Sequence, residues 1–250
     1  MTQVIHYSDE GVLHRELIEA VAREGLPATA TEIYRGRNIV ATIESVGIKV
    51  NIKSFAIPNI VNRYVYGRLR KSKARRSFEN SLQLTALGFN VPAPLAYIEE
   101  KHSISFGKSY YISQHIDALT EMRYPERHPF MRELLEALGR EMARLHKAGV
   151  WMKDFSPGNV LFHRRPNGSF IFYYVDLNRI SFGTYSELKL NRMWERLLFA
   201  TDQIAIATRA YAEALGLDPQ KVYAEAIKCW NRFKKRKNYH HPPSPYTNHE

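Results

Sequence analysis

The stretch that decides the fold is residues 150–179, which read VWMKDFSPGNVLF, then HRRPNGS, then FIFYYVDLNR. Asp154 and Asn159 occupy the spacing D-x-x-x-x-N, and a short apolar segment follows them directly. The Asn-Gly pair at 167–168 is a strong signal for a tight hairpin turn. The β-rich run after this turn ends on Asp176. The pattern therefore predicts a loop, a strand, a turn and a second strand that ends on an acid.

These residue types suit the chemistry of phosphoryl transfer. Asp154 on the loop is placed to accept the proton of an attacking hydroxyl group. Asn159 and Asp176 carry the oxygen ligands that Mg²⁺ prefers when it also binds substrate phosphates. A structural alternative stays open, in which Asp154 forms an Asx turn and Asp176 only caps a strand.

The same residues resemble the protein-kinase-like superfamily. Asp154 to Asn159 match the catalytic loop, and Asp176-Leu177-Asn178 stands where the DFG motif stands. The sequence departs from the kinase pattern at Met152-Lys153, which replace His-Arg, and at Asn178, which replaces the glycine of DFG. No A-P-E signal follows, and the segment before the next helix is short. These features argue against a protein kinase regulated through its activation segment.

Residues 30–57 are predicted to form a β-meander, with apolar and polar side chains alternating along 48–55. In the kinase-like interpretation, Gly36 lies in a turn that covers the phosphates, and Lys53 binds their oxygens. The four residues that end on Lys53 (VNIK) resemble the V-A-I-K strand of kinases. Lys49 is a rival for the same role, and both lysines could instead only solvate the outer face of a sheet.

The segment from Ser72 to Leu87 is predicted to be a helix with Phe78 and Leu82 on its buried side. In the kinase-like interpretation, Glu79 of this helix pairs with Lys53 and holds it on the phosphates. The alternative is an ordinary exposed helical glutamate.

Two strands are predicted next, over 95–99 and 109–116. The second ends in Gln114-His115-Ile116, which would be the hinge where backbone groups of Gln114 and Ile116 bind the adenine of a nucleotide.

The remainder of the chain is predicted to be mostly helical. A clear amphipathic helix covers 130–148, and further helices are expected from about 186 to 198, over 201–215 and over 219–236. The apolar residues of the first helix repeat every three to four positions, at Leu134, Leu138, Met142 and Leu145. We interpret His146 as a helix-end residue near the negative end of the dipole rather than a catalyst.

The composition is that of a basic globular protein. The chain has 250 residues, of which 44% are hydrophobic, which suits one domain or two small lobes. Its net charge of +11 favours anionic partners. The sequence has no signal-peptide pattern, no apolar run near the ~20 residues of a spanning helix, and a single cysteine, Cys229. We therefore expect a cytoplasmic protein.

The densest basic run lies between Arg63 and Arg76, with tyrosines interleaved. The run is either a solvated face or a surface that docks on phosphate groups of a lipid or glycan. None of the sequence-readable nucleic-acid motifs is present, so we do not expect a nucleic-acid partner. Residues 1–29 contain a predicted helix with no assigned chemistry, and the Pro- and His-rich tail at 240–250 is expected to be loose.

Several segments between residues 50 and 180 together resemble the lipopolysaccharide kinase (Kdo/WaaP) family, whose compact kinase-like enzymes phosphorylate sugars of the lipopolysaccharide inner core. The segments are IKSF at 52–55, KSKA at 71–74, residues 88–94, Leu145-His146, KDFSPGN at 153–159 and DLNR at 176–179. The D-x-N-R ending in place of DFG is the most specific of these features.

The resemblance implies an α+β, bilobed protein-kinase-like fold that forms a single kinase-like domain overall. A small β-rich N-lobe with one main helix would cover 1–116, and a mostly helical C-lobe with the catalytic loop would cover 117–239. The resemblance also implies ATP and Mg²⁺, with a sugar hydroxyl of Kdo or heptose as acceptor. That sugar belongs to a lipid-anchored anionic glycan at the inner face of a membrane, where the protein would be peripheral.

On this interpretation, Asp154 orients or deprotonates the acceptor hydroxyl, and Asn159 and Asp176 hold Mg²⁺ on the phosphates. Lys53, steadied by Glu79, neutralises developing charge. The candidate substrate contacts are Lys153 and Arg179.

Three alternatives stay open at this point. The protein could be a kinase for another small molecule or for a protein. It could be a nucleotide-binding pseudokinase that acts as an interaction module, as Asn178 and the glycine-poor turn would allow. It could also be an RNA-binding protein, which would show steeply salt-dependent affinity.

Overall fold

A computed structural model of the chain describes residues 2–56, 71–102, 105–197 and 199–237. By their contacts, the residues form two compact units, of which the first contains 1–120 and 161–180, and the second 121–160 and 181–250. The boundary predicted after residue 116 did not anticipate that 161–180 belongs with the N-terminal residues. The predicted tail at 240–250 and residues 63–70 of the basic run lie outside the described residues.

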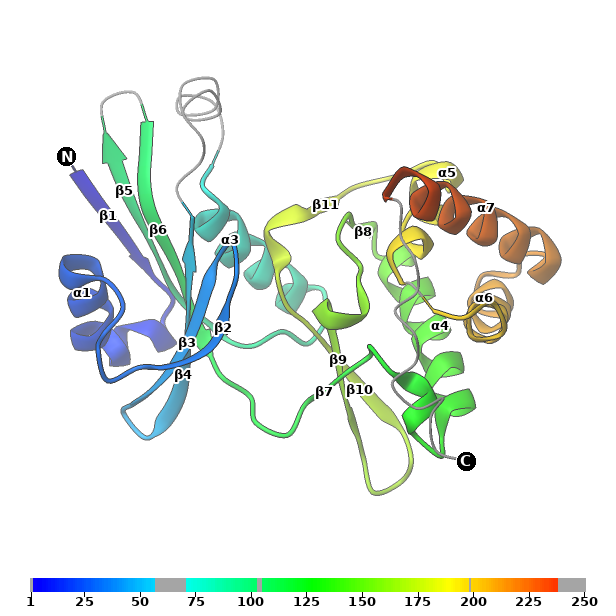
Figure 1. Cartoon of the computed structure of the whole chain (residues 1–250), viewed down its shortest axis with the longest axis horizontal. Helices are drawn as coiled ribbons and strands as arrows, with labels where there is room; N and C mark the ends of the chain where they lie inside the picture. The colour runs from blue at the N-terminus through cyan, green and yellow to red at the C-terminus, as the bar shows by residue number, and fades with distance from the viewer. Residues whose placement is uncertain (1, 57–70, 103–104, 198, 238–250) are drawn as a thin grey trace. The chain divides into compact units, whose positions relative to one another are not determined.

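The first unit is built on a six-stranded antiparallel sheet with the order β1-β5-β6-β4-β3-β2 (Figure 1). Its strands are β1 (Thr2–Tyr7), β2 (Thr31–Arg35), β3 (Ile39–Ser45), β4 (Ile48–Phe55), β5 (Pro94–His102) and β6 (Ser105–Gln114). The predicted meander is confirmed in β2, β3 and β4. Strand β1 was not predicted, and it joins the sheet by pairing with β5, with Ile5 opposite Ile98.

The alternation along β4 decides which helix covers which face of the sheet. The helical segments of this unit are η1 (Glu10–His14), α1 (Arg15–Glu24), α3 (Lys73–Ala86) and η4 (Leu177–Arg179). Ile52 faces the side where Ile18 of α1 is buried. Lys53 and Phe55 point to the opposite face, where Phe55 packs against Phe78 of α3. Lys53 is therefore on the face that α3 covers.

Helix α3 confirms the predicted helix but not its predicted buried side. Leu82 is exposed, with a relative accessibility of 43%. The buried residues are Ala74, Ser77, Phe78, Ser81 and Leu84. Small serines allow the helix to approach the sheet closely, so the buried stripe contains polar residues that hydrophobic spacing alone does not identify. At its start, the Ser72 side chain accepts a hydrogen bond from the Arg75 N–H, as an N-cap does.

A hairpin that belongs mainly to the first unit follows the loop at 154–159. It consists of β9 (Val160–Arg164) and β10 (Phe170–Tyr174), which form a small sheet with β7 (Thr120–Glu121). Gly168 has φ = 82° in the turn, the left-handed conformation that the Asn-Gly pair predicts. The Tyr174 N–H donates to the Asn90 carbonyl at 3.2 Å. This bond anchors the end of β10 beside the segment that follows α3.

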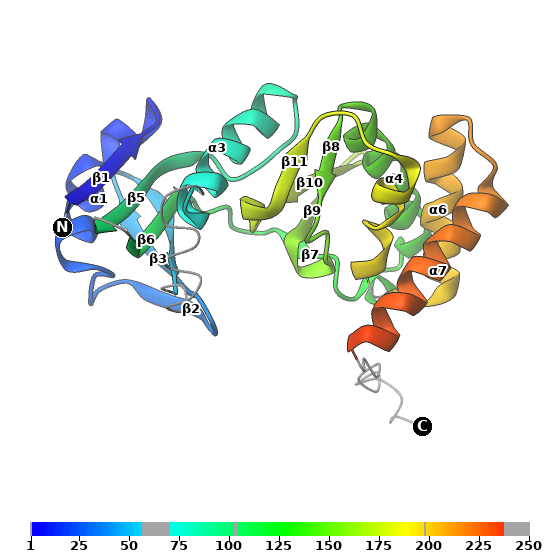
Figure 2. The same ribbon diagram turned by 90° about the horizontal axis from the view of Figure 1, so that it is seen from above.

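The second unit is mainly helical, as predicted, with α4, α6 and α7 packed together (Figure 2). Its elements are η2 (Pro125–Arg127), α4 (Met131–Lys147), β8 (Val150–Met152), η3 (Pro157–Asn159), β11 (Ile180–Phe182), α5 (Glu187–Asn191), η5 (Trp194–Arg196), α6 (Thr201–Leu215) and α7 (Pro219–Lys237). The four predicted apolar residues of α4 are fully buried. Gly139 lies so close to α6 that a Cβ there would be 2.1 Å from the Ala207 carbonyl oxygen.

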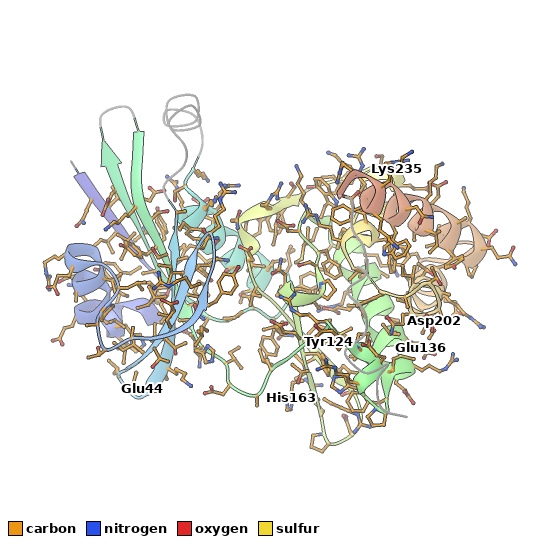
Figure 3. All side chains as sticks on the ribbon, viewed as in Figure 1. Glu44, Tyr124, Glu136, His163, Asp202 and Lys235 are labelled. Carbon is orange, nitrogen blue, oxygen red and sulfur yellow. The ribbon has the colours of Figure 1, made fainter. Side chains whose placement is uncertain are left out.

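The single helix expected from about 186 to 198 is instead broken. Helix α5 ends at Asn191, and a separate 3-10 turn, η5, contains the fully buried Trp194. Charged side chains such as Glu44 and Lys235 lie at the surface of their units (Figure 3). Among the described residues, no helix is both long enough and apolar enough to span a bilayer.

Candidate active site

In the first unit, the structure brings together Lys53 and Asp176. The Lys53 Nζ donates to Asp176 Oδ1 at 2.6 Å, and the two side chains are only 16% and 30% exposed. Lys53 comes from β4, and Asp176 from the chain just after β10. An ion pair shielded in this way from water is stronger than one at the surface. Oδ2 of Asp176 forms no hydrogen bond or ion pair with the residues that the structure describes.

Asp176 has an unusual backbone conformation, with φ = 57° and ψ = 49°. Non-glycine residues adopt this left-handed region rarely, and such residues cluster at functional sites. The Asn178 side chain donates from Nδ2 to Asp176 Oδ1 at 2.6 Å, and Asn178 is buried. Asn178 departs from the glycine of DFG, and here its side chain has a defined role, because it donates to the same Asp176 oxygen that Lys53 contacts.

Helix α3 supports the backbone next to Asp176. Arg76 Nη1 donates to the Asn178 carbonyl at 2.7 Å, and Asn80 Nδ2 donates to the Leu177 carbonyl at 2.6 Å. Arg76 and Asn80 are four residues apart, so they lie on one face of the helix. This face therefore sets the position of the segment that carries Asp176.

A positive cluster surrounds the Asp176 carboxylate. Lys73 lies with its Nζ 5.9 Å from the centre of the Phe55 ring, and Lys53 lies 5.4 Å from the same ring. Burial lowers the pKa of Lys73, and the nearby cations Arg37, Arg76 and Lys53 lower it further, whereas Asp176 raises it. A cluster with several cations and one carboxylate is suited to a polyanionic ligand such as a triphosphate.

The predicted pair between Glu79 and Lys53 is not formed. Glu79 instead accepts hydrogen bonds from Lys71 at 2.7 Å and from Arg75 at 2.8 Å. Burial opposes ionisation of Glu79, but these two hydrogen bonds prevail and lower its pKa. The reason is helical geometry: Glu79 is one turn after Arg75, on a different side of α3 from Arg76 and Asn80.

Lys49 lies away from this cluster. It pairs with Asp117 at 3.0 Å on an exposed part of the unit. At the predicted hinge, β6 ends at Gln114. The Gln114 N–H donates to the backbone carbonyl of Ala93, and the His115 N–H donates to the backbone carbonyl of Lys49. Ile116 follows, and its backbone forms no hydrogen bond with the residues that the structure describes. Its N–H and C=O suit the predicted contact with a nucleotide base.

The predicted phosphate turn is tight and exposed. The Gly36 N–H donates to the Asn38 carbonyl at 3.1 Å, and a Cβ at Gly36 would lie 2.4 Å from the Tyr34 hydroxyl oxygen. Arg37 of the same turn acts electrostatically on Lys73. The side chain of Arg37 therefore lies close enough to Lys73 to contribute to the positive cluster.

In the second unit, the loop from Asp154 to Asn159 is fixed by its own hydrogen bonds. The Asp154 carbonyl accepts from the Ser156 N–H at 2.8 Å and from Asn159 Nδ2 at 2.9 Å. Phe155 is buried and anchors the loop in the core. Because the Asn159 amide nitrogen is held in this way, its Oδ1 is the atom left for a ligand.

The carboxylate of Asp154 forms an ion pair that the sequence did not suggest. Its Oδ1 contacts Nη1 of Arg196 in η5, and the two side chains are 20% and 25% exposed. Lys153, the neighbour of Asp154 in sequence, is exposed, and so is Arg179 in the first unit. The proposed contacts of Lys153 and Arg179 with the substrate remain predictions.

His146 lies in the last turn of α4, as predicted, but its side chain is buried. It is buried, with Nδ1 2.8 Å from the Tyr211 hydroxyl and Nε2 2.8 Å from Met193 Sδ. A thioether only accepts, so Nε2–H donates to Met193, and Nδ1 accepts from Tyr211. Burial lowers the pKa of His146 to about 4, so desolvation outweighs the helix dipole.

The oxygen ligands fit a hard divalent cation. The described residues contain no group of three or more His, Cys, Asp or Glu side chains that could enclose a metal. Mg²⁺ does not need one, because it is commonly bound by one or two protein oxygens together with substrate phosphates. Asp176 in the first unit and Asn159 in the second each carry a side-chain oxygen with the chemistry for this role.

Sequence reasoning missed the supporting residues more than the central ones. The stripe of Lys73, Arg76 and Asn80 on α3 has helical spacing and could have been found from that spacing. Arg196 had no local sequence signal. The single helix predicted around it is broken in the structure, so helical spacing could not show where its side chain lies.

Comparison with protein families matched the lipopolysaccharide kinase (Kdo/WaaP) family over residues 35–215. A solved structure of WaaP in complex with acyl carrier protein is 19% identical, aligns with a TM-score of 0.64, and covers 95% of this chain and 98% of that chain. Rio2 kinase from Chaetomium thermophilum, solved with ADP, Mg²⁺ and phosphoaspartate, is 17% identical, with a TM-score of 0.49 over 88% of this chain and 75% of that one. Curated protein sequences gave no significant match. The likeness to WaaP confirms the predicted α+β, protein-kinase-like fold.

Proposed function

Because the matched residues make up most of its length, the chain belongs to the lipopolysaccharide kinase (Kdo/WaaP) family, and we propose that it phosphorylates a sugar of the lipopolysaccharide inner core. The phosphoryl donor is ATP, and the acceptor is a hydroxyl of Kdo or heptose. The observation that carries this proposal is the shielded pair of Lys53 and Asp176, which α3 supports through the backbone of residues 177–178. A site built only for interaction would not require this arrangement.

The residues of the chain act by positioning and by electrostatics. Lys53 and the positive cluster neutralise charge on the phosphate oxygens, as a reaction without a covalent enzyme intermediate requires. Asp154 holds the acceptor hydroxyl through a hydrogen bond and receives its proton as the reaction proceeds. The acceptor oxygen forms a bond to the γ-phosphorus, the bond from this phosphorus to the bridging oxygen breaks, and ADP leaves. The proton passes from Asp154 to solvent.

Asn159 and Asp176 are the residues that would hold Mg²⁺. When bound, the ion neutralises phosphate charge and orients the transferred group. Asn178 keeps the Asp176 carboxylate in place by donating to its Oδ1.

The net charge of +11 supports an anionic, lipid-anchored acceptor. The acceptor class implies work at the inner face of a membrane, where attraction to anionic headgroups would keep the protein peripheral. Part of this charge lies on α7, where Lys235 and Arg236 are exposed near the end of the helix.

The test is transfer of labelled phosphate from ATP, with Mg²⁺, to rough lipopolysaccharide and to its isolated core sugars. We expect incorporation that Asp176→Ala lowers by at least about 10²-fold, since one electrostatic contact to a transition state has this magnitude. Asp202→Ala is the matched control, because Asp202 is an exposed acid on α6 (Figure 3). Asp202→Ala should transfer phosphate as the wild type does.

Each other outcome supports a different alternative. Incorporation into a protein or a soluble metabolite, with none into glycan, would favour a kinase for another acceptor. ATP binding without any turnover would favour the pseudokinase.

A further inference from the structure

The second unit contains a contact whose purpose the proposed reaction does not yet explain. Arg196 contacts Oδ1 of Asp154, the carboxylate expected to receive the acceptor proton. Both side chains are at least three-quarters shielded from water. An ion pair with this shielding has a much larger effect on side-chain orientation than a pair at the surface.

Arg196 is itself held firmly in place. It ends η5, whose Trp194 is fully buried and packs edge-to-face on Tyr211 with ring centres 5.4 Å apart. Its guanidinium carbon lies 5.3 Å from the centre of the Phe233 ring of α7. A guanidinium group on an aromatic face is fixed in both position and plane. Phe233 therefore limits the directions in which Arg196 can point.

The buried Nε of Arg196 is a second indication that the contact with Asp154 decides how the Arg196 side chain is oriented. This nitrogen has no hydrogen-bond partner among the described residues. Leaving a buried donor unpaired is unfavourable. The arrangement that satisfies Asp154 thus prevails over one that would satisfy Nε.

The lysine next to Asp154 in sequence does not orient the Asp154 carboxylate. Lys153 precedes Asp154 directly but is exposed. The backbone of Asp154 is fixed by Ser156 and Asn159, and neither of these bonds reaches the carboxylate. Arg196 supplies an orientation for the side chain that those backbone bonds do not supply.

We propose that Arg196 is a positioning residue that aims the Asp154 carboxylate at the acceptor hydroxyl, with Phe233 of α7 as its support. The inference rests on the proposed function, because it assigns a role towards the base of that reaction. The rest of η5 and α7 then matters for catalysis although neither supplies a reacting group.

Three variants test the role through turnover, read as ADP release with glycan acceptor and also with water alone. Arg196→Met should lower kcat by about 10²-fold, which is the effect of misplacing a reacting group by about 1 Å. The KM for ATP should stay within about threefold, since Lys53 and Asp176 are unchanged. Arg196→Lys should recover part of the loss, because it restores the charge but not the planar group. Phe233→Leu should give a smaller loss in the same direction.

Arg209→Met is the matched control. Arg209 is an arginine on α6 in an exposed ion pair with Glu213, and such pairs contribute little. It should retain the kcat of the wild type.

A double-mutant cycle followed by thermal unfolding tests the contact between Arg196 and Asp154 and needs no acceptor. Arg196→Met and Asp154→Ala should each lower Tm by a few degrees, and the double variant should be no less stable than the worse single variant, because either change removes the same pair. Additive shifts in Tm, or an unchanged kcat in Arg196→Met, would overturn the inference. A wild type that hydrolyses ATP but phosphorylates no glycan would overturn the proposed acceptor, and the comparison with water as acceptor would still decide the role of Arg196.

Discussion

The burial of His146 makes a quantitative prediction about pH. In the folded unit its pKa is about 4, because its ring is buried in contact with Tyr211 and Met193 and burial disfavours the charged form. In the unfolded chain the ordinary value near 6.5 applies. Below about pH 6.5 the unfolded chain therefore binds a proton that the folded unit does not bind. The free energy of unfolding falls as the pH drops through this range, and the loss is complete only below about pH 4, where the folded unit also binds the proton.

The size of the effect follows from the two pKa values. The linkage relation gives a loss of about 2 kcal/mol between about pH 7.5 and about pH 5, and about 3 kcal/mol by about pH 4. His146→Gln removes this titration. The variant loses packing at every pH, so the informative quantity is how much its stability changes between the two pH values. That change should be smaller than in the wild type by about 2 kcal/mol.

Urea unfolding followed by tryptophan fluorescence is a suitable assay. All of the tryptophans, Trp151, Trp194 and Trp230, belong to the second unit, which also contains His146, so the signal reports on this unit. His163→Gln is the control, since His163 is exposed on β9 (Figure 3). If His146→Gln and the wild type lose the same stability on acidification, the burial argument is refuted.

Two further predictions follow from close contacts. Lys53→Met should lower phosphoryl transfer by at least about 10²-fold, whereas Lys49→Met should change it less than about twofold, because Lys49 pairs only with an exposed acid. Equal losses, measured as ADP release, would contradict the assignment of Lys53. Gly139→Ala should destabilise the second unit by about 1–3 kcal/mol or more, since its Cβ would overlap the Ala207 carbonyl. Calorimetry that shows an unchanged Tm would mean that α4 and α6 are further apart.

The elements with regular patterns could be predicted from the sequence. Helix α4 was predicted from its apolar spacing, and α6 has the expected bounds. The strands around Gly47 and the Asn-Gly hairpin followed from alternation and turn chemistry. Each of these signals depends on neighbours within one or two turns of chain, so it can be read locally.

The central residues of the candidate site also had a sequence signal. Asp154, Asn159 and Asp176 were found from their spacing and from the strand that delivers Asp176. These residues could be recognised from the sequence because a loop and the end of a strand are features of a short stretch of chain.

Tertiary structure alone decided the partners of these residues. Glu79 pairs with Lys71 and Arg75 rather than Lys53, because the rotation of α3 about its axis is set by how the helix packs on the sheet. Asp154 meets Arg196 because η5 is held by buried Trp194 and by α7. Side-chain partners depend on distances across the fold, and residues far apart in the chain leave no periodic trace of such contacts. The sequence by itself therefore determined the elements and the reactive groups, whereas packing determined how each group is held.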